Sequence, residues 1–146
     1  MEQQLRDVNV LWTPDLTVGS PALDEHNREM FNQLGTVEDV IASASPEALA
    51  SWLTEVIDQL AWLLTAEEGE LAGIGYPELA FHRQLHDRAR ARIQATRIQL
   101  GKKPDAVMLT TLTRDTCAAL SVWLMRHVQD ADKLFFPYID PRYRDT

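Results

Sequence analysis

The sequence has a single cysteine, Cys117, among its 146 residues. One thiol cannot form a disulfide within the chain, and this favours the reducing cytosol, so we expect a cytoplasmic protein. Cys117 stands next to alanine and leucine, and we expect a small buried side chain and not a reactive thiol. The first seven residues lack the apolar core of a signal peptide. The densest apolar stretch, 60–64, is too short to cross a bilayer.

Basic residues are also scarce. The chain has 14 Lys and Arg against 22 Asp and Glu, which gives a net charge of −8 and a pI near 4.9. This balance argues against nucleic acid and anionic membranes as partners, because both attract a basic surface. The length and an apolar fraction of 45% suit one globular domain over residues 1–146 with its own hydrophobic core.

Four prolines each come just before a long segment with helical periodicity: Pro21, Pro46, Pro77 and Pro104. Proline is favoured in the first helical turn, and Ser20 and Ser45 are suitable N-caps. Glycines at 73 and 101 are expected to end two of the helices. The sequence therefore predicts helices over 20–43, 46–72, 77–101 and 104–129.

Short connections require neighbouring helices to run in opposite directions. Apolar residues recur every three or four positions in each segment, which predicts one buried face per helix. We therefore expect an all-α fold, an up-down-up-down antiparallel four-helix bundle. Residues 1–19 and 133–146 are predicted to be arms that pack on the bundle through Trp12, Pro14, Phe135, Phe136, Pro137, Tyr138 and Pro141.

All four histidines lie on predicted helix faces that otherwise carry core residues: His26, His82, His86 and His127. His82 and His86 are one turn apart and share a face. Glu67 continues the apolar stripe of the second helix, and Asp132 follows the fourth. Each residue alone could be an ordinary core side chain, but two buried carboxylates among four imidazoles require a compensating cation. The set predicts a first-row metal such as iron, manganese or zinc.

These residues belong to a longer ordered pattern. It reads Trp12, Val18-Gly19, Asp24-Glu25-His26, Glu67-Glu68, Gly75-Tyr76-Pro77, His82-x3-His86, and Trp123-Leu124-x2-His127-x4-Asp132. The pattern covers nearly the whole chain and resembles the bacterial hemerythrins. The resemblance implies a four-helix bundle around two iron ions with a bridging oxo or hydroxo group, which bind O2 reversibly.

The resemblance also implies a role for each ligand. One iron would be held by three imidazoles, those of His82, His86 and His127. The other iron would be held by His26, and Glu67 and Asp132 would bridge the pair.

The sequence departs from the family pattern at Leu63, where a second histidine ligand of that other iron is expected. Glu29 stands one helical turn after His26 and can face the same metal, so we interpret the two changes as a coupled exchange of ligands. The alternative is that Glu29 is a solvated surface residue and the second site is weak. Glu68 and Glu70, beside Glu67, are expected to be solvated, and the arginines from Arg83 to Arg97 should form an outer face with acidic partners.

The expected walls of an O2 pocket are apolar and lie beside the ligands: Leu63, Leu64, Trp123, Leu124 and Val128. An ordinary core role serves the aliphatic members equally well, and no catalytic residue is assigned. Three functions remain open: O2 binding for storage, delivery or sensing; an enzyme that consumes O2, peroxide or NO; and a module whose metal is structural, mononuclear or not iron. The expected partner is O2, another small diatomic ligand or peroxide, and no protein partner is indicated.

Overall fold

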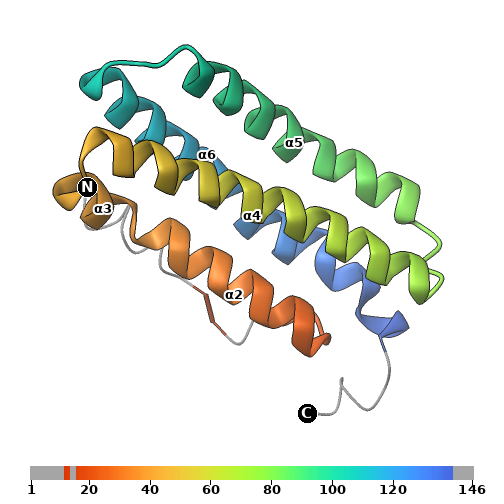
Figure 1. The fold of residues 1–146 in the computed structure, drawn as a ribbon. Helices are drawn as coiled ribbons and strands as arrows, with labels where there is room; N and C mark the ends of the chain where they lie inside the picture. The colour runs from red at the N-terminus through yellow and green to blue at the C-terminus, as the bar shows by residue number, and fades with distance from the viewer. Residues whose placement is uncertain (1–11, 14–15, 140–146) are drawn as a thin grey trace.

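The computed structural model describes residues 12–13 and 16–139, apart from the side chains of Lys133 and Phe136. Five α-helices are followed by a 3-10 helix: α2 (Pro21–Gly35), α3 (Val37–Ser43), α4 (Pro46–Gly73), α5 (Leu79–Gly101), α6 (Ala106–Asp130) and η2 (Asp132–Tyr138). This part of the chain contains no β-strand. The fold is an all-helical bundle in which the long helices α2, α4, α5 and α6 lie side by side (Figure 1).

Three helix starts are fixed by side-chain caps. The hydroxyls of Ser20 and Ser45 accept from backbone N–H groups three residues later, and a proline follows each cap, as predicted. Asp105 does the same for α6 by accepting from Met108 N at 2.8 Å. Pro77 and Pro104 were expected inside the first turns, but α5 and α6 begin two residues after them. Gly73 and Gly101 are the last residues of their helices, as predicted.

The segment predicted as one helix over 20–43 is divided into α2 and α3. The break is at Thr36, whose hydroxyl donates to the carbonyl of Gln33 at 2.8 Å. The backbone N–H of Thr36 donates to the carbonyls of Gln33 and Leu34, which ends the helix. Gly35 precedes the break and weakens the helix, because glycine loses more backbone freedom than other residues in a helix. Apolar periodicity continues across the break, so it did not reveal this interruption.

Helix α4 packs against α2, α5 and α6, so its buried residues form the centre of the core. They include Leu53, Val56, Ile57, Leu60 and Leu64. Cys117 of α6 is fully buried among apolar side chains, as predicted, and burial raises the pKa of its thiol to about 12. Within the described residues, no helix has the length and apolar character needed to cross a membrane.

Residues on both sides of the long helices join the same core. Leu16 and Val18 before α2, and Phe135 and Ile139 after α6, are buried. Asp24 links the first pair to α2, because its carboxylate accepts from Val18 N at 2.6 Å. Of the residues expected to anchor the two arms, Pro14 and Pro141 lie outside the described part of the chain.

Candidate metal centre

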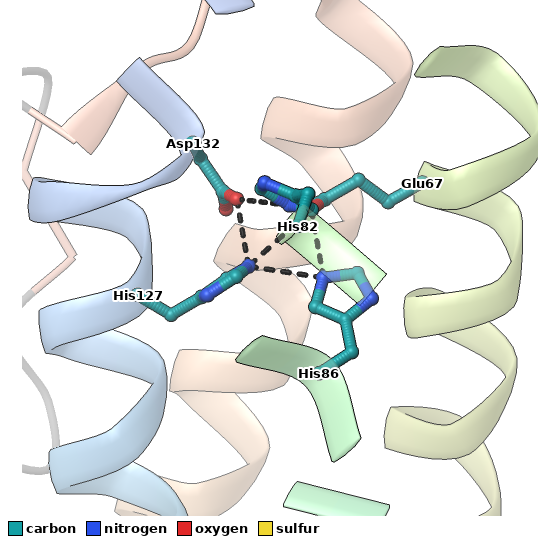
Figure 2. A group of neighbouring side chains, drawn as sticks. All are labelled: Glu67, His82, His86, His127 and Asp132. Atoms are coloured by element: carbon teal, nitrogen blue, oxygen red, sulfur yellow. Dashed lines mark hydrogen bonds and ion pairs between the residues drawn. The ribbon is translucent and has the colours of Figure 1, made fainter. Parts of the chain in front are cut away.

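Five of the seven predicted ligands meet at one end of the bundle. They are Glu67 from α4, His82 and His86 from α5, His127 from α6, and Asp132 just after α6. Each offers one ligand atom, and these five atoms lie within 4.8 Å of one another. Figure 2 shows the five side chains pointing toward a common centre. We call this group the five-residue cluster.

Glu67 Oε1 lies near the Nε2 atom of all three histidines. The distances are 2.5 Å to His82, 3.0 Å to His86 and 3.4 Å to His127. The Nε2 atoms of His86 and His127 are themselves 3.0 Å apart. Two ring nitrogens at that distance share at most one proton, since one of them must act as acceptor. The cluster therefore presents unprotonated nitrogen, the form of histidine that binds metals.

Asp132 is fully buried, and its carboxylate is not satisfied by hydrogen bonds. Oδ1 lies 2.8 Å from His127 Nε2 and 3.1 Å from His82 Nε2, close enough for ion pairs. Neither contact has the direction of a hydrogen bond, and neither carboxylate oxygen has such a bond within the described residues. A buried carboxylate without hydrogen bonds is costly unless a cation offsets it. The donor set of three imidazoles and two carboxylates thus fits a first-row metal ion.

Burial and the neighbouring groups of the cluster shift the pKa values of these side chains. Burial opposes protonation of His127, but the nearby carboxylates of Asp132 and Glu67 outweigh that effect and raise its pKa to about 9. Burial also opposes protonation of His82, and the same two carboxylates raise its pKa. For Glu67, burial favours the neutral acid, but the three imidazoles hold its pKa well below the ordinary value. Burial and the charge of Glu67 raise the pKa of Asp132.

His86 has a second carboxylate on its other side. Its Nδ1 donates to Glu68 Oε2 at 2.5 Å. Arg90 Nη2 donates to the same oxygen at 2.5 Å, and Arg83 Nε lies 3.4 Å from Oε1. A carboxylate on Nδ1 fixes the tautomer and directs Nε2 toward a metal.

The prediction that Glu68 is solvated is wrong, because the residue is buried. A signal for this burial was present in the sequence. Glu68 follows Leu64 by four residues and precedes Leu71 by three, and both leucines belong to the buried stripe of α4.

The other two predicted ligands, His26 and Glu29, lie outside the five-residue cluster. Both line a cavity of about 180 Å³ together with Met30, Gln59, Trp62 and Leu63. The His26 ring packs edge-on against Trp62, with ring centroids 4.7 Å apart. Glu29 is exposed, and Leu63 is buried. The structure thus places His26, Glu29 and Leu63 in the lining of one cavity.

The predicted O2-pocket walls occupy different places. Leu63 lines the cavity beside His26, whereas Leu64, Leu124 and Val128 are buried in the bundle core. Trp123 is half-buried and stacks on His127, with centroids 4.5 Å apart and planes inclined by 13°. Its indole also lines a separate hollow between α5 and α6.

Comparison with known proteins agrees with this centre. A family model described as the hemerythrin HHE cation binding domain matches residues 18–139. Bacteriohemerythrin of Stenotrophomonas maltophilia is 23% identical over 126 residues, which cover 86% of this chain and 78% of that protein. Bacteriohemerythrin of Methylococcus capsulatus is 25% identical over 114 residues, 78% of this chain and 83% of that protein. The chain belongs to the hemerythrin family.

Proposed function

We propose that this chain is a non-haem di-iron protein that binds O2 for storage, delivery or sensing and has an altered second iron site. The observation that carries the proposal is the buried cluster of three imidazoles and two carboxylates. Residues 1–146 would form a single domain, in which the four long helices run in up-down-up-down order. The lone buried thiol favours a reducing cytosol as its location.

His82, His86 and His127 would hold the first iron. Glu67 and Asp132 would bridge toward the second, because their oxygens lie among the Nε2 atoms and are shielded from water. Iron bound here supplies the affinity for O2, while the protein supplies fixed ligand directions. The apolar residues around the cluster exclude water, which protects a bound diatomic ligand from protons.

The second site would use His26 and Glu29. Leu63 cannot bind a metal, and the carboxylate of Glu29 would take the place of the absent imidazole. Support comes from the cavity that these three residues share. A carboxylate in place of an imidazole adds negative charge and a hard oxygen donor, which favours ferric iron. We therefore expect reversible O2 binding to be harder to sustain than in a site with two imidazoles.

A second candidate function is the consumption of O2, peroxide or NO. The observation that favours it is the position of the cavity beside His26, with the exposed residues Glu29 and Trp62 in its wall. A small substrate can enter such a cavity from solvent. Glu29 could then deliver a proton to bound peroxide.

The decisive experiment measures iron per chain and the absorption spectrum of the wild type, Glu29→Ala and Glu25→Ala. Glu25 is an exposed carboxylate on the same helix and serves as the matched control. We expect two irons with the bands of an oxo-bridged pair in the wild type and in Glu25→Ala, and a weakened second iron in Glu29→Ala. One iron in all three proteins would refute the role of Glu29. Addition of O2 to the reduced protein then separates reversible binding from consumption.

A further inference from the structure

A second hollow is lined by residues of α5 and α6 and by Ala131 just after α6. The two helices pack against each other (Figure 1). The hollow has a volume of about 390 Å³ and is distinct from the cavity beside His26. Its apolar lining includes Leu85, Val122 and Trp123, and its charged residues are Arg88, Arg126 and Asp130. Cavities from about 300 Å³ upward accommodate small organic molecules.

The two arginines of this hollow have no acidic partner among the described residues. Four other arginines do: Arg83 and Arg90 pair with Glu68, Arg97 pairs with Asp58, and Arg114 pairs with Glu38. Among the described residues, Arg28 and Arg92 also lack an acidic partner, but neither lines the hollow. Arg88 and Arg126 form no such pair, although the chain carries a net charge of −8. Asp130 is the one carboxylate in the described lining, so the hollow is locally basic on an acidic protein.

The hollow also touches the five-residue cluster through one side chain. His127 and Trp123 are both part of its lining, and the indole of Trp123 stacks on the His127 ring. His127 Nε2 lies in the cluster, and Nδ1 has no hydrogen bond among the described residues. This differs from His86, whose Nδ1 donates to Glu68. A ligand in the hollow would therefore lie against the residue that offers Nε2 to the cluster.

We propose that this hollow binds a small organic anion, with a carboxylate or phosphate on a planar apolar body. Guanidinium groups match the planar geometry of both anions and bind them through paired hydrogen bonds. The apolar residues would cover the body of the ligand, and its contact with His127 would alter the metal centre. An acidic protein is disfavoured as the occupant, because the rest of the negatively charged surface would repel it.

Calorimetric titration of the metal-loaded protein tests this site. The probes are phenyl phosphate and benzoate, with uncharged benzyl alcohol for comparison. We expect saturable binding of both anions and none of the alcohol. Arg88→Gln and Arg126→Gln should each weaken binding about tenfold, the effect of losing a hydrogen bond to a charged group. Arg92→Gln is the matched control, since Arg92 is exposed on α5 but lies outside the hollow. This variant should bind both anions with a Kd within about twofold of that of the wild type.

Three results would overturn the proposal: no saturable binding of either anion, an equal loss in Arg92→Gln, or binding of an oligoglutamate peptide in place of the small anions. Circular dichroism of each variant checks that it is folded. The coupling to His127 rests on the proposed iron function and has its own readout, a shift of the visible spectrum when phenyl phosphate saturates the iron-loaded protein. Binding without a shift would refute the coupling alone. Absence of iron would refute the proposed function, while the calorimetry would still decide the anion site.

Discussion

Nδ1 of His86 donates a hydrogen bond to the carboxylate of Glu68. Among the described residues, no other imidazole of the five-residue cluster has a carboxylate bonded to its Nδ1. Nδ1 of His86 lies 2.5 Å from Glu68 Oε2, and Nε2 of the same ring lies 3.0 Å from Glu67 Oε1. Adjacent residues of α4 thus contact opposite sides of one imidazole. One carboxylate faces the cluster, and the other fixes the ring from behind.

Glu68→Gln should weaken metal binding without removing a ligand. An amide holds the proton of Nδ1 less strongly than a carboxylate and makes the imidazole a poorer donor, so we expect about 10–100-fold lower metal affinity. Competition with a chelator measures the affinity. Glu55→Gln, at an exposed position on the same helix, should leave it unchanged. Equal affinities in all three proteins would contradict a positioning role for Glu68.

Leu63→His should tighten the binding of iron at the proposed second site. Leu63 lines the same cavity as His26 and Glu29, so a histidine there adds an imidazole to the proposed second site. We expect the second iron to resist a chelator better than in the wild type, and to be lost less readily when Glu29→Ala is added. Leu63→Ala, which enlarges the cavity without adding a ligand, is the control. Chelator resistance equal to that of the alanine variant would argue that this cavity is not a metal site.

The metal-free protein should lose stability as the pH rises from about 6.5 to about 9. Burial opposes the charge on His127, but Asp132 and Glu67 raise its pKa from 6.5 to about 9. The folded state therefore holds a proton that the unfolded chain releases first. The stabilisation of the folded state by this proton is fully present below about pH 6.5 and is lost as the pH rises through about 9. The melting temperature of the metal-free protein over this range measures the loss.

Metal should remove that dependence, because a bound ion displaces the proton from the ring nitrogen. The melting temperature of the iron-loaded protein should then change little over the same pH range. The apparent iron affinity should rise with pH, by up to about tenfold per unit for each proton released. A flat profile for the metal-free protein would mean that His127 is already neutral there.

Thr96 and Thr116 join α5 to α6 through a buried hydroxyl pair, with Oγ1 atoms 3.0 Å apart. Thr116→Val should lower the free energy of unfolding by about 1–3 kcal/mol, because it leaves the Thr96 hydroxyl buried and unpaired. The double variant with Thr96→Val should cost less than the two single changes added together. Chemical denaturation measures the free energy of unfolding of the two single variants and of the double variant. As a control, Thr111→Val at an exposed position should stay within about 0.5 kcal/mol of the wild type. Strict additivity would show that the hydroxyls do not interact.

The helical character of the chain could be predicted from the sequence because apolar periodicity, serine caps and terminal glycines are local signals. The same signals missed the break at Thr36, where the apolar stripe continues although the backbone turns. They also predicted five ligands that the structure brings together. Glu67, His82 and His127 are distant in the chain, but each lies on the buried face of its own helix.

The sequence alone determined the residue types that can bind a metal and the helix faces that carry them, since both depend on composition and on the 3.6-residue repeat. Only the tertiary structure decided which carboxylate meets which imidazole. Glu67 and Glu68 are chemically identical neighbours, and the packing of α4 against α5 turns one toward the cluster and the other behind His86. The same packing brought Arg88 and Arg126 to one hollow, without an acidic partner among the described residues. Contacts between helices depend on how three or more elements fit together, and no local signal in the chain encodes that.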